Sequence, residues 1–248
     1  MNYRKAPISE VIFGINFNKR FFSDMELFKL NNYLDNYPIV EYLPTLPDET
    51  ISDGKIIQKL NIESTGALLY RRRTADRKNL VQLQGNKFYF NWIRTDEEPV
   101  GLYSGFESNF IVFKDTIAYF NKVLNRNIFD GVESYELTYQ DRFSIKEYID
   151  DLEKISNYIN IQPICLSHIS TLNSFNYNES YLINELNGDG KLSLSTIFND
   201  LTNEQLLVFQ SVIRGKFDNF DDWFDKAHLK QNEIFEIIFS EELKSKWR

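Results

Sequence analysis

The residues of this sequence with the most chemical potential are one histidine, several amides and a group of arginines. His228 follows Asp225 by three residues in a stretch with helical periodicity. Residues three apart meet on one side of a helix, so the carboxylate could hold the imidazole in one tautomer for acid–base work. The alternative is a half-buried histidine whose ring packs at the edge of an apolar helix stripe. The sequence alone leaves both interpretations open.

Residues 80–94 contain the clearest local structure signal, a two-residue Gly85-Asn86 turn between two stretches of β-forming residues. Such a turn predicts a β-hairpin with Gln84 opposite Lys87, because a two-residue loop fixes the register of its strands. The amide-rich face of this hairpin could be solvated, pair with another sheet element or line a polar pocket. The register gives an apolar face with Val81, Leu83, Phe88, Phe90 and Trp92, and an amide-rich face with Gln82, Gln84, Tyr89, Asn91 and Ile93.

Positive charge is concentrated at residues 71–78, where Asp76 is the one acidic residue. Strand alternation sends Arg71 and Arg73 to one face and Arg72 to the other, which divides the cluster. Two interpretations follow. The cluster is either a solvated hairpin tip, or a site that holds a small anionic ligand or docks a partner, since arginines bind phosphate and carboxylate groups. Arg71 and Arg73 are therefore candidate ligand-binding residues.

The sequence lacks the usual motifs for metal, nucleotide or nucleophilic chemistry. His168 and His228 are sixty residues apart and belong to no zinc-binding spacing. Glycine-rich phosphate loops and a nucleophile elbow are also missing. The single cysteine, Cys165, cannot form an intramolecular disulfide, and its apolar neighbours indicate a buried thiol. We therefore predict no catalytic residue, no metal site and no cofactor, and leave the question of enzymatic activity open with a non-enzyme favoured.

Composition restricts the class of protein. The chain has 248 residues, a net charge of −8 and an aromatic content of 15%. Negative charge repels a phosphate backbone at long range, so nucleic-acid binding is disfavoured. No stretch is apolar enough to span a membrane, and Pro7 and Glu10 interrupt any signal peptide, so a cytoplasmic protein without membrane association is expected. Many rings and few alanines favour helices packed on a sheet.

Periodicity and turn signals predict the elements that position these residues. Ser23 and Glu26 have the spacing of a capping box, and the pattern recurs at 104–107 and 144–147. Residues 206–216 are predicted as a strand, although 202–205 could also cap a helix through 213. The stretch between Pro38 and residue 56 is expected to be irregular. Helices are predicted at 23–37, 105–126, 144–159 and 219–239, strands at 10–17, 56–63, 67–74, 132–143, 164–175, 180–186 and 191–198, and a hairpin turn at 187–190.

These elements predict an α+β fold, a large twisted and mainly antiparallel sheet or two related sheets. The helices at 105–126 and 219–239 are expected to cover one face. We expect residues 1–248 to form a single co-folded unit. The alternative is a division into an α+β half at 1–160 and a strand-rich half at 161–248 that ends in a helix.

Several motifs spread over the chain together resemble a sporadically distributed, uncharacterised prokaryotic protein family of similar length. They are Ala6-Pro7-Ile8-x-Glu10-Val11-Ile12-Phe13, the stretch from Val81-Gln82-Leu83-Gln84 through Phe88 to Asn91-Trp92, Tyr103-x-x-Phe106, and Trp223-x-x-x-Ala227-His228. Ile93, between Trp92 and Arg94, departs from the family pattern. The resemblance implies one co-folded unit in which Gln82, Gln84, Asn91, Trp92 and His228 share a site or a scaffold.

For function, we expect a non-enzymatic binding or assembly component that binds a protein partner or itself, because aromatic residues concentrate at interfaces. The sporadic distribution of the resembling family fits an accessory system such as antiviral defence or a toxin–antitoxin module. One alternative is a ligand sensor or enzyme with a polar pocket near Arg71, Arg73, Gln82, Gln84 and Asn91. A second alternative is a nucleic-acid binder that uses residues 71–78.

Overall fold

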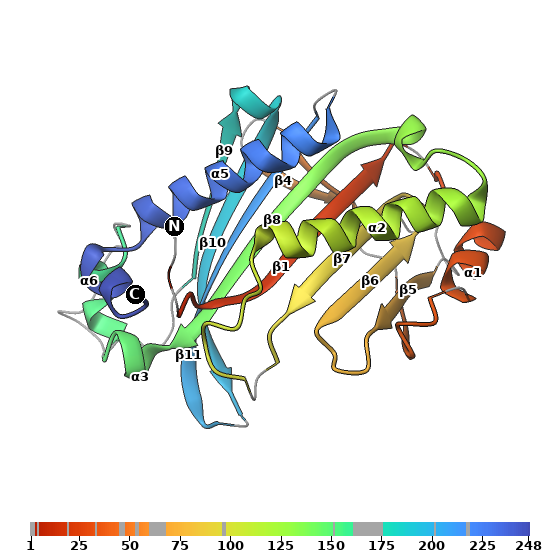
Figure 1. Ribbon diagram of the computed structural model, residues 1–248. Coiled ribbons are helices and arrows are strands. Elements are labelled where there is room, and N and C mark those ends of the chain that lie inside the picture. Colours follow the sequence, from red (N-terminus) through yellow and green to blue (C-terminus); the bar gives the residue numbers. More distant parts are fainter. Residues whose placement is uncertain are drawn as a thin grey trace.

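The central feature of the fold is a nine-stranded antiparallel sheet with the order β2-β5-β6-β7-β1-β8-β11-β10-β9 (Figure 1). The computed structural model describes residues 3–248 except 4, 19, 33, 45–47, 53–54, 60–67, 96–97, 151, 161–175, 201 and 217–218. The strands of the sheet are β1 (Ile8–Phe17), β2 (Ile39–Pro44), β5 (Leu68–Arg73), β6 (Asn79–Gln84), β7 (Lys87–Ile93), β8 (Val132–Ser144), β9 (Asn176–Ile183), β10 (Gly188–Asn199) and β11 (Glu204–Gly215). A separate two-stranded sheet pairs β3 (Asp48–Ser52) with β4 (Lys55–Lys59).

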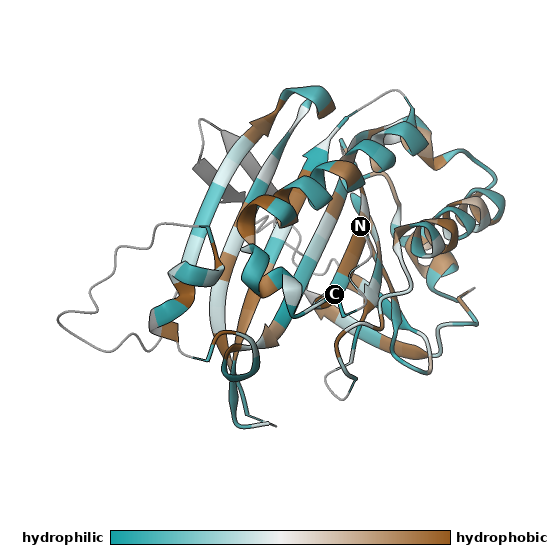
Figure 2. Cartoon of the chain, turned by 60° about the vertical axis from the view of Figure 1, so that its left-hand side comes forward, coloured by the Kyte–Doolittle hydropathy of each residue, from teal (hydrophilic) through white to brown (hydrophobic). Residues whose placement is uncertain are grey.

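Two long helices accompany the sheet, α2 (Phe106–Leu124) and α5 (Phe220–Ile238). Brown and teal bands alternate along α5, as expected for a helix with one apolar side (Figure 2). The shorter helices are α1 (Asp24–Asn32), α3 (Ile145–Tyr148), α4 (Ile155–Tyr158) and α6 (Glu241–Ser245), with 3-10 turns at η2 (Ile128–Gly131), η3 (Leu152–Lys154) and η4 (Asn184–Leu186). In the described part of the chain, no helix is long and apolar enough to cross a membrane.

The predicted α+β class and large antiparallel sheet are confirmed, and so is the register of the central hairpin. Gln84 lies opposite Lys87, and Val81 lies opposite Phe90. Val81 and Phe90 are both fully buried. The apolar face that the turn predicts is therefore part of the main core.

The core between sheet and helices is built from stacked rings centred on Phe13 of β1. Its ring lies 5.9 Å from Phe110 and 5.4 Å from Phe113, both on α2, and 5.8 Å from Phe224 on α5. Both helices thus contact the same side chain of the sheet. Aromatic pairs of this kind add about 1 kcal/mol each beyond simple burial, which ties α2 and α5 to β1.

Strands from both halves of the chain belong to one sheet. β8 pairs with β1 on one side and with β11 on the other, so Leu137 lies between Phe13 and Ile213. This pairing joins residues on either side of position 160, where the alternative division was expected. The helix–strand ambiguity at 202–213 is resolved as a strand.

The first predicted helix is shorter than expected. The Ser23 and Glu26 capping box forms, with the Glu26 amide donating to the Ser23 hydroxyl and the Ser23 amide donating to the Glu26 carboxylate. However, α1 ends at Asn32, and the buried residues Leu34 and Tyr37 lie outside it. The expectation of an irregular stretch after Pro38 was wrong, because residues 39–44 form β2 and residues 48–52 form β3. The strand predicted at 56–63 corresponds to β4 at 55–59, and its last residues lie outside the described part of the chain.

Two other predicted helix features were wrong. Residues 144–159 form two short helices separated by Asp150, whose φ of 73° lies in the left-handed region and interrupts the helix. Ser144 does cap α3, accepting from the Glu147 amide. At α2, however, the N-cap is Gly105 with a φ of 96°, and no side chain caps the helix. Ser104 instead accepts a hydrogen bond from Asn109.

The last predicted turn is displaced along the chain. The connection between β9 and β10 uses η4 and Asn187, whose φ of 44° is left-handed, while Gly188 is already paired with Ile183. The expected turn at 187–190 therefore begins three residues too late. The predicted strand at 164–175, together with Cys165 and His168, lies outside the described residues.

Candidate functional site

A cavity of about 320 Å³ lies among the N-terminal end of α2, the C-terminal half of α5, and strands β8 and β11. Ala6, in the segment before β1, and Ile8, the first residue of β1, also belong to its wall. A volume of this size suits a compact small molecule. The wall is aromatic and acidic, with rings from Tyr3, Tyr103, Phe106, Tyr139, Phe209 and Phe235 and carboxyl groups from Glu107, Asp141 and Glu236.

His228 of α5 lies in this cavity, half-buried and held on three sides. Its ring stacks on Phe106 of α2 with a centroid distance of 4.2 Å. Its Nδ1 lies 3.0 Å from the Tyr139 hydroxyl, and its Nε2 lies 3.3 Å from Nδ2 of Asn232. Burial lowers the pKa of His228 to about 4, so the ring is neutral at pH 7. With Asn232 donating to Nε2, the ring proton is on Nδ1 and is donated to Tyr139.

The Tyr139 hydroxyl continues this chain of hydrogen bonds to Tyr103. The two hydroxyl oxygens are 3.3 Å apart. Burial raises the pKa of both phenols well above the ordinary value, so both remain protonated donors. The Tyr103 ring in turn packs edge-on against Trp92 at 5.0 Å. A continuous row of contacts therefore runs from Trp92 to Asn232, and its members Tyr103, Tyr139, His228 and Asn232 line the cavity.

Asp141 is the most unusual group in the cavity. It follows Tyr139 by two residues in β8, so both side chains lie on the same face of the sheet. The residue is 2% exposed, and its Oδ1 has no hydrogen-bond partner. Burial raises the pKa of the Asp141 carboxyl to about 7, and the positive charge of Arg94 only partly opposes this shift. Near neutral pH this carboxyl group can therefore lose or gain a proton.

Gln231 anchors α5 to the sheet beside the cavity. Its side-chain amide donates to the backbone oxygens of Leu137 (2.9 Å) and Ser211 (3.0 Å), which belong to the neighbouring strands β8 and β11. The residue is 5% exposed. Both hydrogen bonds are thus shielded from water, and they fix the depth at which α5 sits against the sheet.

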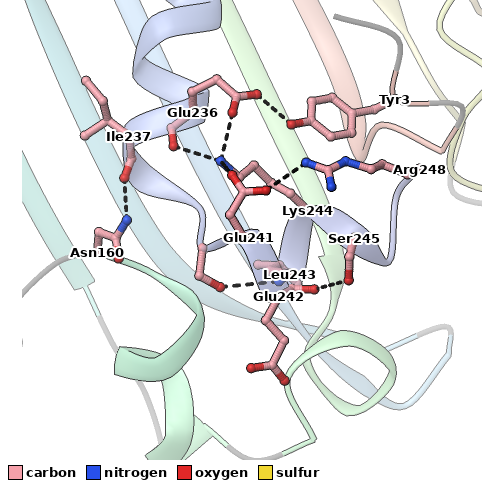
Figure 3. A network of polar contacts seen from close by, with 11 residues as sticks. Tyr3, Asn160, Glu236, Ile237, Glu241, Glu242, Leu243, Lys244, Ser245 and Arg248 are labelled. Carbon is pink, nitrogen blue, oxygen red and sulfur yellow. Dashed lines mark hydrogen bonds and ion pairs between the residues drawn. The ribbon is translucent and has the colours of Figure 1, made fainter.

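A network of polar contacts joins Tyr3 and Glu236, which line the cavity, to helix α6 and the residues that follow it (Figure 3). The Tyr3 hydroxyl donates to Glu236 at 2.6 Å. Lys244 of α6 donates to Glu236 at 2.8 Å and to Glu241 at 2.5 Å, and its side chain is only 4% exposed. Arg248 reaches the other oxygen of Glu241 at 2.8 Å. This network fastens the N-terminal segment to the C-terminal helices at the wall of the cavity.

The structure does not bring the seven candidate residues of the sequence together. Trp92 and His228 lie on the side of the sheet that contacts α2 and α5. Gln82 and Asn91 lie on the opposite face, where Gln82 donates to Asn91 and Asn91 donates to Glu10. Gln84 is 2% exposed and donates to Asn86 within the hairpin turn.

The arginines of the positive cluster are occupied by contacts within the chain. Arg71 and Arg73 each contact Glu41 on the neighbouring strand at 3.2 Å. Arg72 projects to the other face and donates to the side chain of Asn31 in α1 at 2.9 Å. The division of the cluster by strand alternation is thus observed, with Arg71 and Arg73 sharing one carboxylate and Arg72 bound to neutral oxygen atoms.

Sequence reasoning missed Asp141, Tyr139 and Tyr103 as members of a site. The sequence pattern of the strand could have identified Asp141 and Tyr139. In the predicted strand at 132–143, Tyr135, Leu137, Tyr139 and Asp141 alternate as inward-facing positions, so a carboxylate falls in line with core residues. Charged residues are rarely buried without a reason, and this position was therefore a candidate.

Among the described residues, no cluster of three or more histidine, cysteine or acidic side chains is arranged to hold a metal ion. No family model, no curated protein and no solved structure matches this chain, so its site is interpreted from geometry and chemistry alone.

Proposed function

We propose that the protein is a non-enzymatic ligand-binding protein that holds a small molecule in the cavity between α2 and α5. The observation that carries this proposal is the buried Asp141 carboxyl group, whose Oδ1 has no hydrogen-bond partner among the described residues. Buried polar atoms in folded proteins nearly always have a hydrogen-bond partner, because an unpaired one costs about 1–3 kcal/mol. A ligand with a hydrogen-bond donor would supply the missing partner.

The surroundings of His228 support binding over catalysis. Both of its ring nitrogens already have partners within the chain, Tyr139 and Asn232. A general base must reach the proton it removes, and His228 could do so only by giving up one of these hydrogen bonds. Its role in this proposal is to fix the Tyr139 hydroxyl and to present a rigid wall to the ligand.

The proposal takes α2 and α5 to cover one face of the sheet, as the sequence predicts. Their shared contact with Phe13 supports this arrangement. A cavity between two helices and a sheet is then a preformed site that needs little reorganisation on binding, which favours affinity.

A thermal-shift screen with cationic, neutral and anionic small molecules tests the proposal. We expect at least one class of compound to raise the melting temperature of the native protein. Ala6→Phe, which adds a ring to the cavity wall, should abolish that shift, whereas Ala118→Phe on the exposed side of α2 should not. A screen without any stabilising compound, or shifts that persist in Ala6→Phe, would overturn the proposal.

Self-association is a second candidate function, supported by strand β2, which has a strand neighbour on only one side among the described residues. β2 ends the sheet order and exposes Val40 (39%), Tyr42 (56%) and Leu43 (39%). Edge strands with exposed apolar residues readily pair with another chain. Light scattering during size-exclusion chromatography should give a dimer that Tyr42→Lys converts to a monomer, and a native protein that stays monomeric at high concentration would contradict this function.

A role in a prokaryotic accessory system, antiviral defence or a toxin–antitoxin module, remains a proposal based on the family resemblance. A ligand-binding protein would act there as a sensor that passes its bound state to a partner. Repeated occurrence of the gene beside nucleases or toxins would support this role, and an unrelated neighbourhood in each genome would argue against it.

A further inference from the structure

Among the described residues that line the cavity, the charged side chains are all acidic. They are Glu107, Asp141 and Glu236, and no described lysine or arginine is part of the wall. The three carboxyl groups differ in their surroundings. Glu236 is paired with Lys244, and Glu107 is exposed to solvent, while Asp141 is buried. Electrostatics in a cavity of this kind oppose an anionic ligand and favour a cationic one.

The positive charge of Arg94 does not fully offset the cost of burying the Asp141 carboxylate. Arg94 lowers the pKa of the carboxyl group, but burial outweighs it and the pKa stays raised. The phenol of Tyr139 also interacts with Asp141, and it carries no charge at neutral pH because burial raises its pKa. A further positive charge in the cavity would therefore stabilise the ionised carboxylate.

The aromatic rings of the wall suit the same kind of ligand. Phe209, Phe235 and Tyr3 also line the cavity, and the ring centroids of Tyr3 and Phe235 are 5.4 Å apart. The faces of such rings carry partial negative charge and attract cations, and their apolar surface receives a hydrocarbon or aromatic skeleton. The hydrogen bond to Asp141 restricts the cation further. Oδ1 of Asp141 requires a hydrogen-bond donor on the cationic group, and a quaternary ammonium has no N–H to donate.

We propose, on the basis of the proposed ligand-binding function, that the ligand is a compact organic cation with an N–H-bearing ammonium or guanidinium group. Its charged group meets the Asp141 carboxylate at the floor of the cavity. Its apolar body lies against the rings of Phe209, Phe235 and Tyr3. This assignment replaces the small anionic ligand that the arginines at 71–73 suggested, since those arginines already contact Glu41 and Asn31.

Four probes of nearly equal shape test this inference by isothermal titration calorimetry with the full chain. They are 2-phenylethylamine, its N,N,N-trimethyl derivative, 2-phenylethanol and 3-phenylpropionate. We expect 2-phenylethylamine to bind most tightly, and Asp141→Asn to weaken it by about thirtyfold or more, because the variant removes the charge but keeps the shape. Asp115→Asn, an exposed position on α2 with the same change in charge, is the matched control and should bind like the native protein.

The possible outcomes separate this inference from the proposed function. Tighter binding of 2-phenylethanol or 3-phenylpropionate, blocked by Ala6→Phe, would keep the ligand-binding function and overturn the cationic ligand. Equal binding of the trimethyl derivative, or full binding by a folded Asp141→Asn variant, would overturn the contact with Asp141. If none of the four probes binds while other compounds of the screen do, the cationic class is wrong. If no compound at all binds, the proposed function fails as well.

Discussion

Nδ1 of His228 lies 3.0 Å from the hydroxyl oxygen of Tyr139, and this hydrogen bond joins helix α5 to strand β8 across 89 positions of the sequence. It places a helix residue and a sheet residue in one wall of the cavity. Because the imidazole also stacks on Phe106, the same side chain connects α5 to α2. The arrangement of both long helices around the cavity thus depends on His228.

Replacing His228 with alanine should therefore destabilise the fold. The change removes the stack on Phe106 and leaves the buried Tyr139 hydroxyl without its imidazole partner, for an expected loss of about 2–3 kcal/mol. Leu229→Ala, on the exposed side of α5, should stay within about 0.5 kcal/mol. In a double-mutant cycle with Tyr139→Phe, urea denaturation should show a coupling of about 1 kcal/mol. Strict additivity of the two single changes would mean that the hydrogen bond does not form.

The stability of the protein should depend on pH through two groups that act in opposite directions. The pKa of Asp141 is raised from 3.8 to about 7, so the folded state holds this proton more firmly and the contribution of Asp141 to stability falls as pH rises from about 4 to 7. The pKa of His228 is lowered from 6.5 to about 4, so its contribution rises with pH between about 4 and 6.5 and is complete above that.

These opposing contributions can be separated by substitution. In Asp141→Asn, the free energy of unfolding should rise from pH 4 to 6.5 more steeply than in the native protein. In His228→Gln, it should fall from pH 4 to 7. Urea denaturation at half-unit pH intervals gives both curves, and parallel curves for all three proteins would show that neither group is shifted by the fold.

The amide of Gln231 should contribute measurably to stability. Gln231→Met keeps the length of the side chain but removes the donors to Leu137 and Ser211, for an expected cost of about 1–3 kcal/mol. The same substitution at Gln205, a half-buried position of β11, is the control variant, and its change in the free energy of unfolding is compared with that of Gln231→Met. If both variants lose the same free energy of unfolding, the hydrogen bonds of Gln231 to the strand carbonyls do not stabilise the protein as proposed.

Lys244 should control how firmly the N-terminal segment is held at the cavity. Lys244→Met leaves Glu236 and Glu241 without their shared cation, so two carboxylates face each other next to Tyr3. We expect faster hydrogen exchange of the backbone amides of Lys5, Ala6 and Ile8, while the amides of β7 keep their protection. Unchanged exchange in the N-terminal segment would indicate that the network in Figure 3 does not hold it.

The sequence predicts features that are determined locally. The Gly85-Asn86 turn gives the correct hairpin register, and the alternation of Arg71 and Arg72 gives their correct faces. Both follow from the geometry of a single hairpin or strand. Local patterns give a wrong prediction where the backbone conformation of one residue interrupts an element. The apolar positions of the helix predicted at 144–159 are all buried, but Asp150 has a left-handed φ and divides the helix.

The site could not be predicted in the same way, because it depends on contacts between distant segments. His228, Tyr139 and Tyr103 meet only once α5, β8 and the loop before α2 are folded together. No periodicity shows that β8 lies between β1 and β11, which is what directs Asp141 toward α5. The amides of Gln82 and Asn91 were correctly placed beside each other, but on the face opposite the cavity.

In the proposed binding mode, the buried carboxyl group of Asp141 pairs with the cationic group of the ligand. Carbon-13 NMR of the labelled carboxyl group measures its titration directly, with Asp141→Asn identifying the signal. We predict that the free protein titrates near pH 7 and that saturating 2-phenylethylamine lowers this pKa toward the ordinary range, because the ammonium stabilises the carboxylate. A pKa near 4 in the free protein, or one that the amine does not change, would contradict the account.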